Sequence, residues 1–277
     1  MVSTYQIKPA LILQPFISCY SLRIFNTGEK VMPQPLHAIY EYFLTFFLKY
    51  KFCKVKDNSG KVETRSSSLV TFFTESQGCV YYQGCYVLFC VQFKSNGLFA
   101  IFGIPQKMLI NSIMPIEDIL GNDYRSLNEQ LGSSKDIFEM SKYMNIYLTQ
   151  NLLCQKHKQH TTIISICSGM ILRKRGIISL DSLAHYANMS TRNFERRFIE
   201  EVGMPPKLYS RIVRFYNAIE TKMLHPGKSW TDITYENGYY DQAHFIREVK
   251  SFSSKTPEEL FNITPPPTEK FTEIASS

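Results

Sequence analysis

The sequence lacks the short motifs that mark common enzymes. It contains no G-x-S-x-G nucleophile motif, no P-loop and no dinucleotide-binding fingerprint, all of which use glycines to bring backbone close to a phosphate or to shape a nucleophile turn. Histidine is scarce as well, and only His37 lies in the strand-rich first half. A metal-dependent barrel enzyme needs two or three converging histidines. We therefore expect no metal, no cofactor and no enzymatic activity.

Long apolar segments and paired cysteines are also missing. The most apolar stretch, "YEYFLTFFLKY", carries Glu41 and Lys49 and is too short to span a bilayer. The seven cysteines are odd in number and form no C-x-x-C pair, which is typical of reduced thiols in a cytoplasmic protein without membrane association. Cys79, Cys85 and Cys90 are expected as small buried strand residues, and a redox-sensing role for them is left open.

Charge alone does not single out a nucleic-acid-binding half. Lys and Arg number 31 against 24 Asp and Glu, a balance that permits an anionic partner without requiring one. Residues 1–165 hold 16 basic and 11 acidic side chains, and the remainder holds 15 and 13. A DNA-binding hypothesis must therefore depend on which helix face carries the arginines.

The first half is rich in predicted strands. From Ser18 to about Gly103, aromatic and β-branched runs alternate with turn sequences such as "NTGEK", "DNSGK" and "QG". The runs are "SCYSLRIF", "EYFLTFFLKY", "SLVTFFT" and "CVYYQGCYVLFCVQF". They predict an antiparallel sheet curled into a barrel or sandwich. Most of its aromatic residues are expected in the core, and a minority could line an apolar ligand pocket.

After Pro115 the apolar period changes from two to three or four. Residues 136–153 carry an apolar stripe that suits packing either on the sheet or on a second copy of the chain: Ile137, Met140, Met144, Tyr147, Leu148 and Leu152. Polar residues 155–162 are the predicted linker. The resulting domains are 1–154 and 163–264, followed by a proline-rich tail, 265–277, that is expected to be disordered.

Residues 179–198, "SLDSLAHYANMSTRNFERRF", combine two short helical patterns with a break. Ser179 and Ser190 are suitable N-caps on either side of "NMS". Apolar residues repeat at helical spacing in both segments: Leu180, Leu183, Ala184, Ala187, then Phe194, Phe198 and Val202. Two short helices crossing over a shared core are typical of a helix-turn-helix.

The polar side chains left over on the second helix form its outer face: Arg192, Asn193, Glu195, Arg196 and Arg197. Planar guanidinium groups suit bidentate contact with guanine and charged contact with phosphate. A solvated charged face is the ordinary interpretation of such a helix, so this feature alone does not establish DNA binding.

The pattern recurs in "SWTDITYENGYYDQAHFIREVKSF". Ser229 is a suitable cap, Gly238 marks the bend, and Phe245 and Val249 point inward. The outer face offers Asp241, Gln242, His244 and Arg247. Between the units, "PKLYSRIVRFYNAIETKML" at 206–224 predicts a helix of roughly 28 Å. That length approaches one duplex turn, so two reading helices could enter successive major grooves.

In these two units the chain resembles the AraC/XylS-type transcription regulators. The similar segments are "LAHYANMSTRNFERRFIEEVGMPPKLYSRIVR" and "DITYENGYYDQAHFIREVKSFSSKTPEEL". The resemblance implies a promoter-binding regulator, usually an activator, with double-stranded DNA and RNA polymerase as partners. It also implies that the first half is a cupin-like domain for effector sensing or dimerisation. Separately, the apolar stripe predicts dimerisation through residues 136–153, although a helix packed on its own sheet would show the same stripe. The expected fold is α+β, with an amino-terminal antiparallel β-barrel or sandwich and an all-α carboxyl-terminal domain of two helix-turn-helix units.

Carried over by motif position, Arg192, Glu195 and Arg196 face DNA in the first unit, and Gln242, Ala243, Ile246 and Arg247 do so in the second. The second unit departs from the family at three positions, where Val249, Ser254 and Phe261 replace the usual Phe, Gly and Arg. Ser254 is expected to strain a bend that glycine would accept. The alternative function is a ligand-binding or catalytic barrel joined to a helical module that binds protein.

Overall fold

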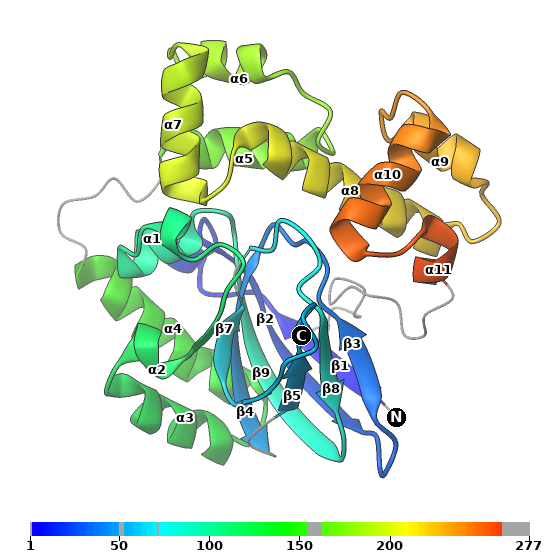
Figure 1. The fold of residues 1–277 in the computed structure, drawn as a ribbon. Helices are drawn as coiled ribbons and strands as arrows, with labels where there is room; N and C mark the ends of the chain where they lie inside the picture. Colours follow the sequence, from blue (N-terminus) through cyan, green and yellow to red (C-terminus); the bar gives the residue numbers. More distant parts are fainter. Residues whose placement is uncertain (1, 50–52, 71, 155–161, 262–277) are drawn as a thin grey trace.

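The computed structural model describes residues 2–49, 53–70, 72–154 and 162–261 (Figure 1). The amino-terminal half contains two antiparallel sheets, which confirms the predicted α+β sandwich class. The six-stranded sheet has the order β1 (Val2–Ile7), β2 (Ile17–Asn26), β9 (Cys85–Phe93), β4 (Tyr42–Lys49), β7 (Ser68–Val70) and β10 (Ile113–Pro115). The four-stranded sheet has the order β3 (Met32–Pro35), β8 (Cys79–Tyr82), β5 (Cys53–Lys56) and β6 (Val62–Arg65).

Strand β9 lies in the middle of the larger sheet and is buried on both faces. Its register pairs Phe89 with Leu22 of β2 and with Phe46 of β4. Because side chains alternate along a strand, Phe89 packs on the helical side, whereas Leu88 and Cys90 face the smaller sheet. The predicted aromatic core is confirmed for the following residues: Phe72, Phe73, Tyr82, Tyr86, Phe89 and Phe93.

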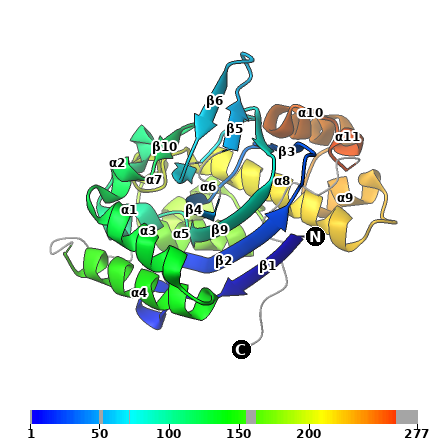
Figure 2. The same cartoon turned by 90° about the horizontal axis from the view of Figure 1, so that it is seen from below.

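Helices cover the face of the large sheet that points away from the smaller sheet (Figure 2). They are α1 (Gly97–Phe102), α2 (Glu117–Leu120), α3 (Asp123–Ser133) and α4 (Ile137–Cys154). The prediction of strands up to about Gly103 is wrong at α1, because the short apolar run "GLFAIF" fits a strand or a helix equally well. Gly103 ends this helix in a left-handed conformation, with φ +69°. Most of the α4 stripe, from Ile137 to Leu152, is buried, so that face packs within its own domain.

The carboxyl-terminal half is entirely helical in the described residues. Its helices are α5 (Ile163–Arg173), α6 (Leu180–Tyr186), α7 (Thr191–Val202), α8 (Pro206–Leu224), α9 (Trp230–Glu236), α10 (Gln242–Ser253) and α11 (Pro257–Phe261). The helix predicted at 206–224 has the same bounds in the structure, and the two helix pairs predicted on either side of it are formed. The predicted linker lies outside the described residues except for Thr162, which caps α5. The predicted disordered tail lies outside them altogether.

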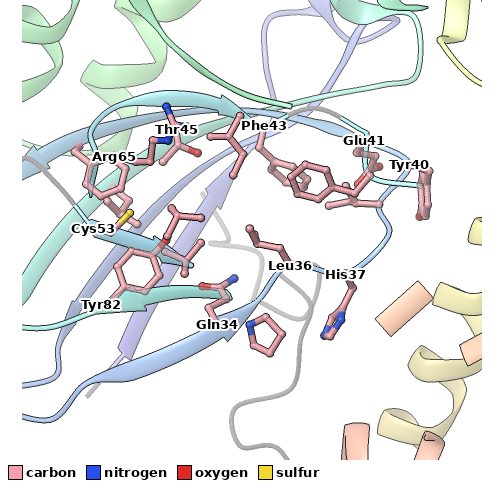
Figure 3. A pocket seen from close by; sticks show the side chains of 18 of the residues that line it. Gln34, Leu36, His37, Tyr40, Glu41, Phe43, Thr45, Cys53, Arg65 and Tyr82 are labelled. Carbon is pink, nitrogen blue, oxygen red and sulfur yellow. The ribbon is translucent and has the colours of Figure 1, made fainter. Parts of the chain in front are cut away.

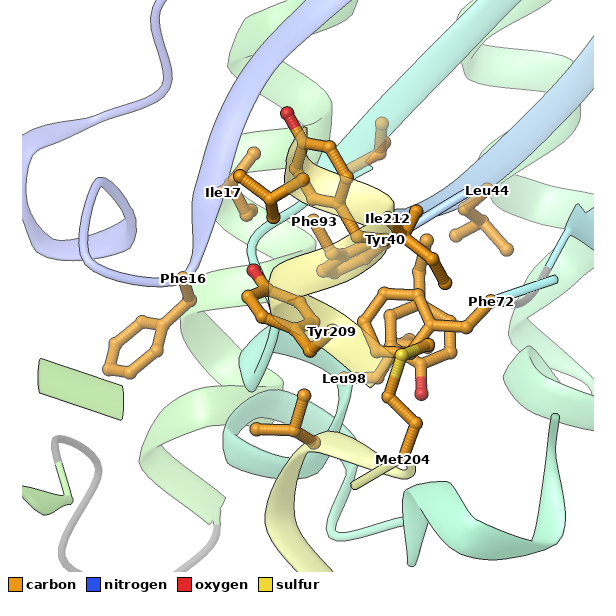
Figure 4. Packing of buried hydrophobic residues seen from close by; sticks show 14 of the residues in the cluster. Phe16, Ile17, Tyr40, Leu44, Phe72, Phe93, Leu98, Met204, Tyr209 and Ile212 are labelled. Carbon is orange, nitrogen blue, oxygen red and sulfur yellow. The ribbon is translucent and has the colours of Figure 1, made fainter. Parts of the chain in front are cut away.

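One hydrophobic core runs through both halves (Figure 4). Tyr209 of α8 is fully buried between Tyr40 and Phe72 of the first half and Phe198 of α7, with ring centroids 5.6 to 6.3 Å apart. A buried hydrogen bond joins Ser95 to Ser168 of α5 at 2.6 Å. None of the helices in the described part of the chain has the length and apolar character needed to cross a membrane.

Candidate DNA-binding surface

The first bend is built as its sequence predicts. Ser179 accepts a hydrogen bond from the Ser182 amide at 3.1 Å and caps α6, and Ser190 accepts one from the Asn193 amide at 3.3 Å and caps α7. Asn188 takes a left-handed conformation between the helices, with φ +52°, which Asn tolerates better than most residues. Phe194 and Phe198 are fully buried, so the core uses the apolar face and leaves the polar face of α7 outside.

All five predicted α7 site residues reach solvent, to different degrees, and Arg197 is half-buried. Arg192, Asn193 and Arg196 are exposed, and Glu195 is half-buried. The Arg196 side chain is 65% exposed, donates to Asn193 Oδ1 at 3.0 Å and lies 3.4 Å from Glu200 Oε2. Exposed pairs of this kind are weak, so a phosphate or guanine can displace them at little cost.

Arg197 has a different environment. Its Nη2 lies 2.8 Å from Glu201 Oε1, and Glu201 is buried. Glu201 also accepts a hydrogen bond from Thr162, the N-cap of α5. Removing one partner of a buried charge leaves the other uncompensated. The geometry therefore gives Arg197 a role in joining α7 to the start of α5, and its predicted DNA contact remains untested.

The second bend repeats the arrangement with different chemistry. Ser229 caps α9, and Asp241 caps α10 by accepting from the His244 amide at 2.6 Å. Gly238 supplies the left-handed turn at φ +70°. On α10, three predicted site residues are exposed and two are half-buried: first Gln242, Ala243 and Arg247, then His244 and Ile246. Arg247 is the only arginine on this face.

A buried carboxylate fixes α10 to α8. Glu248 of α10 is 3% exposed, and its Oε1 lies 2.5 Å from Arg211 Nε and 3.7 Å from Arg214 Nη2. Arg214 also donates to the Gly238 carbonyl at 3.3 Å and stacks over the Tyr239 ring at 5.1 Å. These contacts hold the second unit at one angle to α8. The sequence pattern gave no sign of them, because Glu248 looks like an ordinary helix-surface residue until α8 is placed beside it.

The connecting helix α8 has the predicted length, 19 residues. Both units pack on it. On the side of the first unit, a side chain at Gly176 would come within 2.3 Å of the Ser210 carbonyl, so only glycine permits this approach. Arg175 donates to Thr221 Oγ1 of α8 at 2.9 Å.

The amino-terminal half contains a cavity of about 110 Å³ between its two sheets (Figure 3). Its wall is mostly apolar, with Phe43, Val80 and Leu88 among the lining residues, and includes the polar side chains of Glu41 and Arg65. Tyr216 of α8 completes the wall. A molecule in this cavity would therefore contact α8, the helix on which both helix-turn-helix units pack.

The segment of residues 36–42, which joins β3 to β4, contributes to this wall and contacts the carboxyl-terminal half at several points. The Ala38 amide donates to the Phe252 carbonyl of α10 at 2.8 Å. The Tyr40 ring lies 5.3 Å from that of Tyr216. The Tyr42 hydroxyl donates to Gln106 at 3.0 Å, beside Gly203 at the end of α7.

His37 and Glu41 belong to this segment and do not lie at the surface. Both side chains are buried. Glu41 accepts a hydrogen bond from Gln92. Burial, with a smaller contribution from the nearby Lys255 charge, lowers the pKa of His37 to about 4. Residues 36–42 have no strand period, so the sequence gives no sign that they lie under α10.

The remaining histidines and cysteines form no evident reactive centre. His185 is exposed on α6, as expected, and His157 and His160 lie outside the described residues. All seven cysteines are free thiols, with Cys79 and Cys85 half-buried and Cys90 buried. In the ranges that the structure describes, no three His, Cys, Asp or Glu side chains are grouped so as to hold a metal ion.

The sequence of residues 183–263 matches a family model described as a helix-turn-helix domain. The match lies in the segment where the chain resembles the AraC/XylS-type regulators, and it shows a helix-turn-helix domain there. The carboxyl-terminal half therefore contains a helix-turn-helix domain, and the two-sheet domain precedes it in the chain.

Solved structures with a related arrangement share little sequence with this chain. ToxT from Vibrio cholerae, in a P21 crystal form, is 10% identical with a TM-score of 0.49, over 88% of this chain and 99% of that one. ToxT from strain SCE256 with a bound unsaturated fatty acid is 12% identical with a TM-score of 0.48, over 90% and 98%. The AraC-like transcriptional activator CuxR is 13% identical with a TM-score of 0.28, over 78% and 86%. No protein of curated function matches the chain in sequence.

Proposed function

We propose that this protein is a sequence-specific regulator that activates transcription by placing α7 and α10 in successive major grooves of promoter DNA. The observation that carries the proposal is the repetition of a capped, bent helix pair at both ends of one rigid helix, with Arg192 and Arg196 outside one unit and Arg247 outside the other. The 19-residue spacer is about 28 Å long, close to the roughly 34 Å that separates equivalent positions on one side of a duplex.

The two units are proposed to contribute unequally to base recognition. In the first unit, Arg192 and Arg196 can make bidentate contacts to guanine, and Asn193 can do so to adenine. In the second unit, Ala243 and Ile246 offer only apolar contacts, such as to thymine methyl groups. We therefore assign most of the direct base recognition to α7 and more backbone and shape recognition to α10.

The test is binding of the full-length protein to a duplex that it selects from a random library. Arg196→Ala should lower affinity for that duplex by about 1 to 3 kcal/mol and relax base preference in one half-site, because a bidentate base contact is lost. Arg125→Ala is the matched control, since Arg125 is exposed on α3 of the other domain. Failure to enrich any sequence, or equal affinity of the wild type and Arg196→Ala, would contradict the proposal.

We also propose that the amino-terminal cavity binds a small, mainly apolar effector. Its size and lining support a compact ligand with few polar groups, and its contact with Tyr216 provides a direct route to α8. A thermal-shift screen of small aromatic and aliphatic compounds should find ligands that raise the melting temperature. Val55→Phe, which places a larger ring on the cavity wall, should abolish the shift, whereas Val62→Phe on the exposed hairpin should not.

The partners proposed for this activity are promoter DNA, RNA polymerase and a second copy of the chain. The proposed dimer interface lies within residues 136–153, as predicted. Because the apolar stripe on the other face of α4 is buried in its own domain, the interface uses the outer face of this helix. Three apolar side chains are exposed along that face and share one side of the helix: Phe138, Ile146 and Leu153. Together they support a helix-to-helix contact between two copies.

A further inference from the structure

We propose that Tyr240 and Lys174 form a phosphate-contact surface between the two units. This inference rests on the proposed DNA-binding function and extends it to residues that neither the motif positions nor the family match assigns. Tyr240 comes from the turn of the second unit, and Lys174 comes from the loop that joins α5 to α6. The two segments approach each other in the gap between the helix pairs, on the side away from the amino-terminal domain (Figure 1).

Tyr240 is unusually exposed for an aromatic residue. Its relative exposure is 86%, the highest of any large hydrophobic residue in the described chain, whereas the adjacent Tyr239 is 3% exposed. The next residue, Asp241, has extended backbone angles, φ −152° and ψ 170°. The two adjacent tyrosines face different environments, Tyr239 the core and Tyr240 the solvent. With Tyr239 held inward, Tyr240 is directed away from the protein.

The turn that presents Tyr240 is rigid. Arg214 stacks on the Tyr239 ring and donates to the Gly238 carbonyl. Tyr239 also packs edge-on against Phe245, with ring centroids 5.0 Å apart. The first unit has no equivalent of Tyr240, because only Met189 separates its left-handed Asn188 from the cap Ser190. The second unit therefore carries an extra, firmly supported tyrosine.

A cationic loop of the first unit lies beside this turn. Ile177 contacts Gly238, since a Cβ placed on that glycine would come within 3.1 Å of the Ile177 side chain. Arg175 is tied to Thr221 of α8. Lys174 is exposed at the end of α5. Arg175 thus anchors the loop, Lys174 is exposed on it, and Ile177, three residues further on, contacts the turn that carries Tyr240.

Phosphate is the partner that fits this chemistry best. Two helices in successive major grooves leave the intervening sugar-phosphate strands opposite the middle of the domain. Lysine supplies a point charge there and tyrosine a neutral hydroxyl donor, and both contact backbone phosphates in protein–DNA complexes. The Asp241 carboxylate caps α10 and accepts a hydrogen bond from one of its first amide groups. In this proposal the phosphate is therefore contacted by the Tyr240 hydroxyl and not by the N-terminus of α10.

The two residues can be tested separately with the duplex selected by the full-length protein, at salt concentrations from 50 to 200 mM. Lys174→Ala should weaken binding and reduce the slope of log affinity against log salt by about one, because one fewer counterion is displaced. Tyr240→Phe should weaken binding about 2- to 10-fold at every salt concentration without changing the slope, because only a neutral hydrogen bond is removed. Base preference should stay the same in both variants.

Matched controls are Lys142→Ala on α4 and Tyr5→Phe on β1, both at exposed positions of the other domain. Affinities of Tyr240→Phe and Lys174→Ala within twofold of the wild type would overturn the inference, as would a change in base preference. If Arg196→Ala loses binding while these two variants do not, only this inference fails. If the wild type selects no sequence at all, the proposed function fails with it.

Discussion

Ser254 ends α10 in a conformation that suits glycine better than serine. Its φ is +61° and its ψ is 15°, and its side chain is exposed. The left-handed region costs a residue with a Cβ about 1 to 2 kcal/mol, whereas replacing serine by glycine loosens the unfolded chain by about 0.4 to 1 kcal/mol. The first effect is larger. Ser254→Gly should therefore raise the free energy of unfolding by about 0.5 to 1 kcal/mol in urea titrations.

Ser251→Gly serves as the control for that substitution. Ser251 is also exposed, but it lies inside α10 with helical backbone. Glycine there should lower stability by roughly 0.5 kcal/mol, because serine has the better helix propensity. Equal effects of the two substitutions would show that the backbone angle at Ser254 is not strained.

His37 should make the protein less stable in mild acid. Burial lowers its pKa from 6.5 to about 4 in the folded state, so the folded protein binds this proton less readily than the unfolded chain. The stability that the protein gains by keeping the His37 imidazole neutral is complete above pH 6.5 and is lost as the pH falls toward 4. From pH 7 to pH 5 the loss should be about 2 kcal/mol. His37→Gln removes the titrating group, and the difference between its urea-derived stability and that of the wild type should follow this pH dependence.

A wild-type stability that changes with pH in parallel with His37→Gln would contradict this account of the imidazole. The comparison is needed because carboxylates elsewhere in the chain also titrate in this range. Glu236 and Glu259 both have lowered pKa values, through a hydrogen bond from Lys228 and through hydrogen bonds from Thr256 respectively. Those contributions are common to the two proteins and cancel in the difference.

At the level of elements, local signals predicted most helices and several strands. The helices of the carboxyl-terminal half were predicted from capping serines, from the proline pair before α8 and from apolar residues three or four positions apart. Each of these signals acts within one turn of helix. The strands β1, β3, β5, β6 and β10 were not predicted. Strand β3 contains Pro33 and Pro35, which argue against a central strand, and the sheet tolerates them because β3 lies at its edge.

The outer face of α4 is the element on which the proposed dimer depends. Ile146 is half exposed in the middle of that face, with Phe138 and Leu153 on either side. Ile146→Asp should dissociate the dimer in sedimentation experiments at micromolar concentration, because a charge in an apolar contact loses its hydration. Val62→Asp, at an exposed position of β6, should leave the association unchanged. A wild-type protein that stays monomeric throughout that range would count against the interface.

For the whole molecule, the sequence predicted the outward arginines of α7 but not the contacts that orient the two units. Arg192 and Arg196 could be identified because helical period alone separates them from the buried Phe194 and Phe198. The pairing of Glu248 with Arg211 depends on residues 37 positions apart. The contacts of residues 36–42 with α8 and α10 span still longer distances along the chain. Periodicity carries no information about such neighbours, so they emerge only from the fold.

The shared core predicts that the two halves unfold together. Trp230 is the single tryptophan and packs between Phe245 and Phe261, so its fluorescence reports on the second helix-turn-helix unit. Far-UV circular dichroism includes the amino-terminal sheets. In the wild type the two signals should change at the same urea concentration, as expected for one cooperative unit.

Tyr209→Ala should separate those transitions. It removes a fully buried ring that lies between Tyr40, Phe72 and Phe198, and large-to-small changes of this kind cost about 3 to 5 kcal/mol. Since the lost contacts join the two halves, the Trp230 transition should move to lower urea than part of the circular dichroism change. Leu183→Ala, buried within the first bend, should cost about 2 to 5 kcal/mol while both signals still change together. Coincident transitions in Tyr209→Ala would mean that the halves are coupled through other contacts, such as those of Ala38 with Phe252 and Ser95 with Ser168.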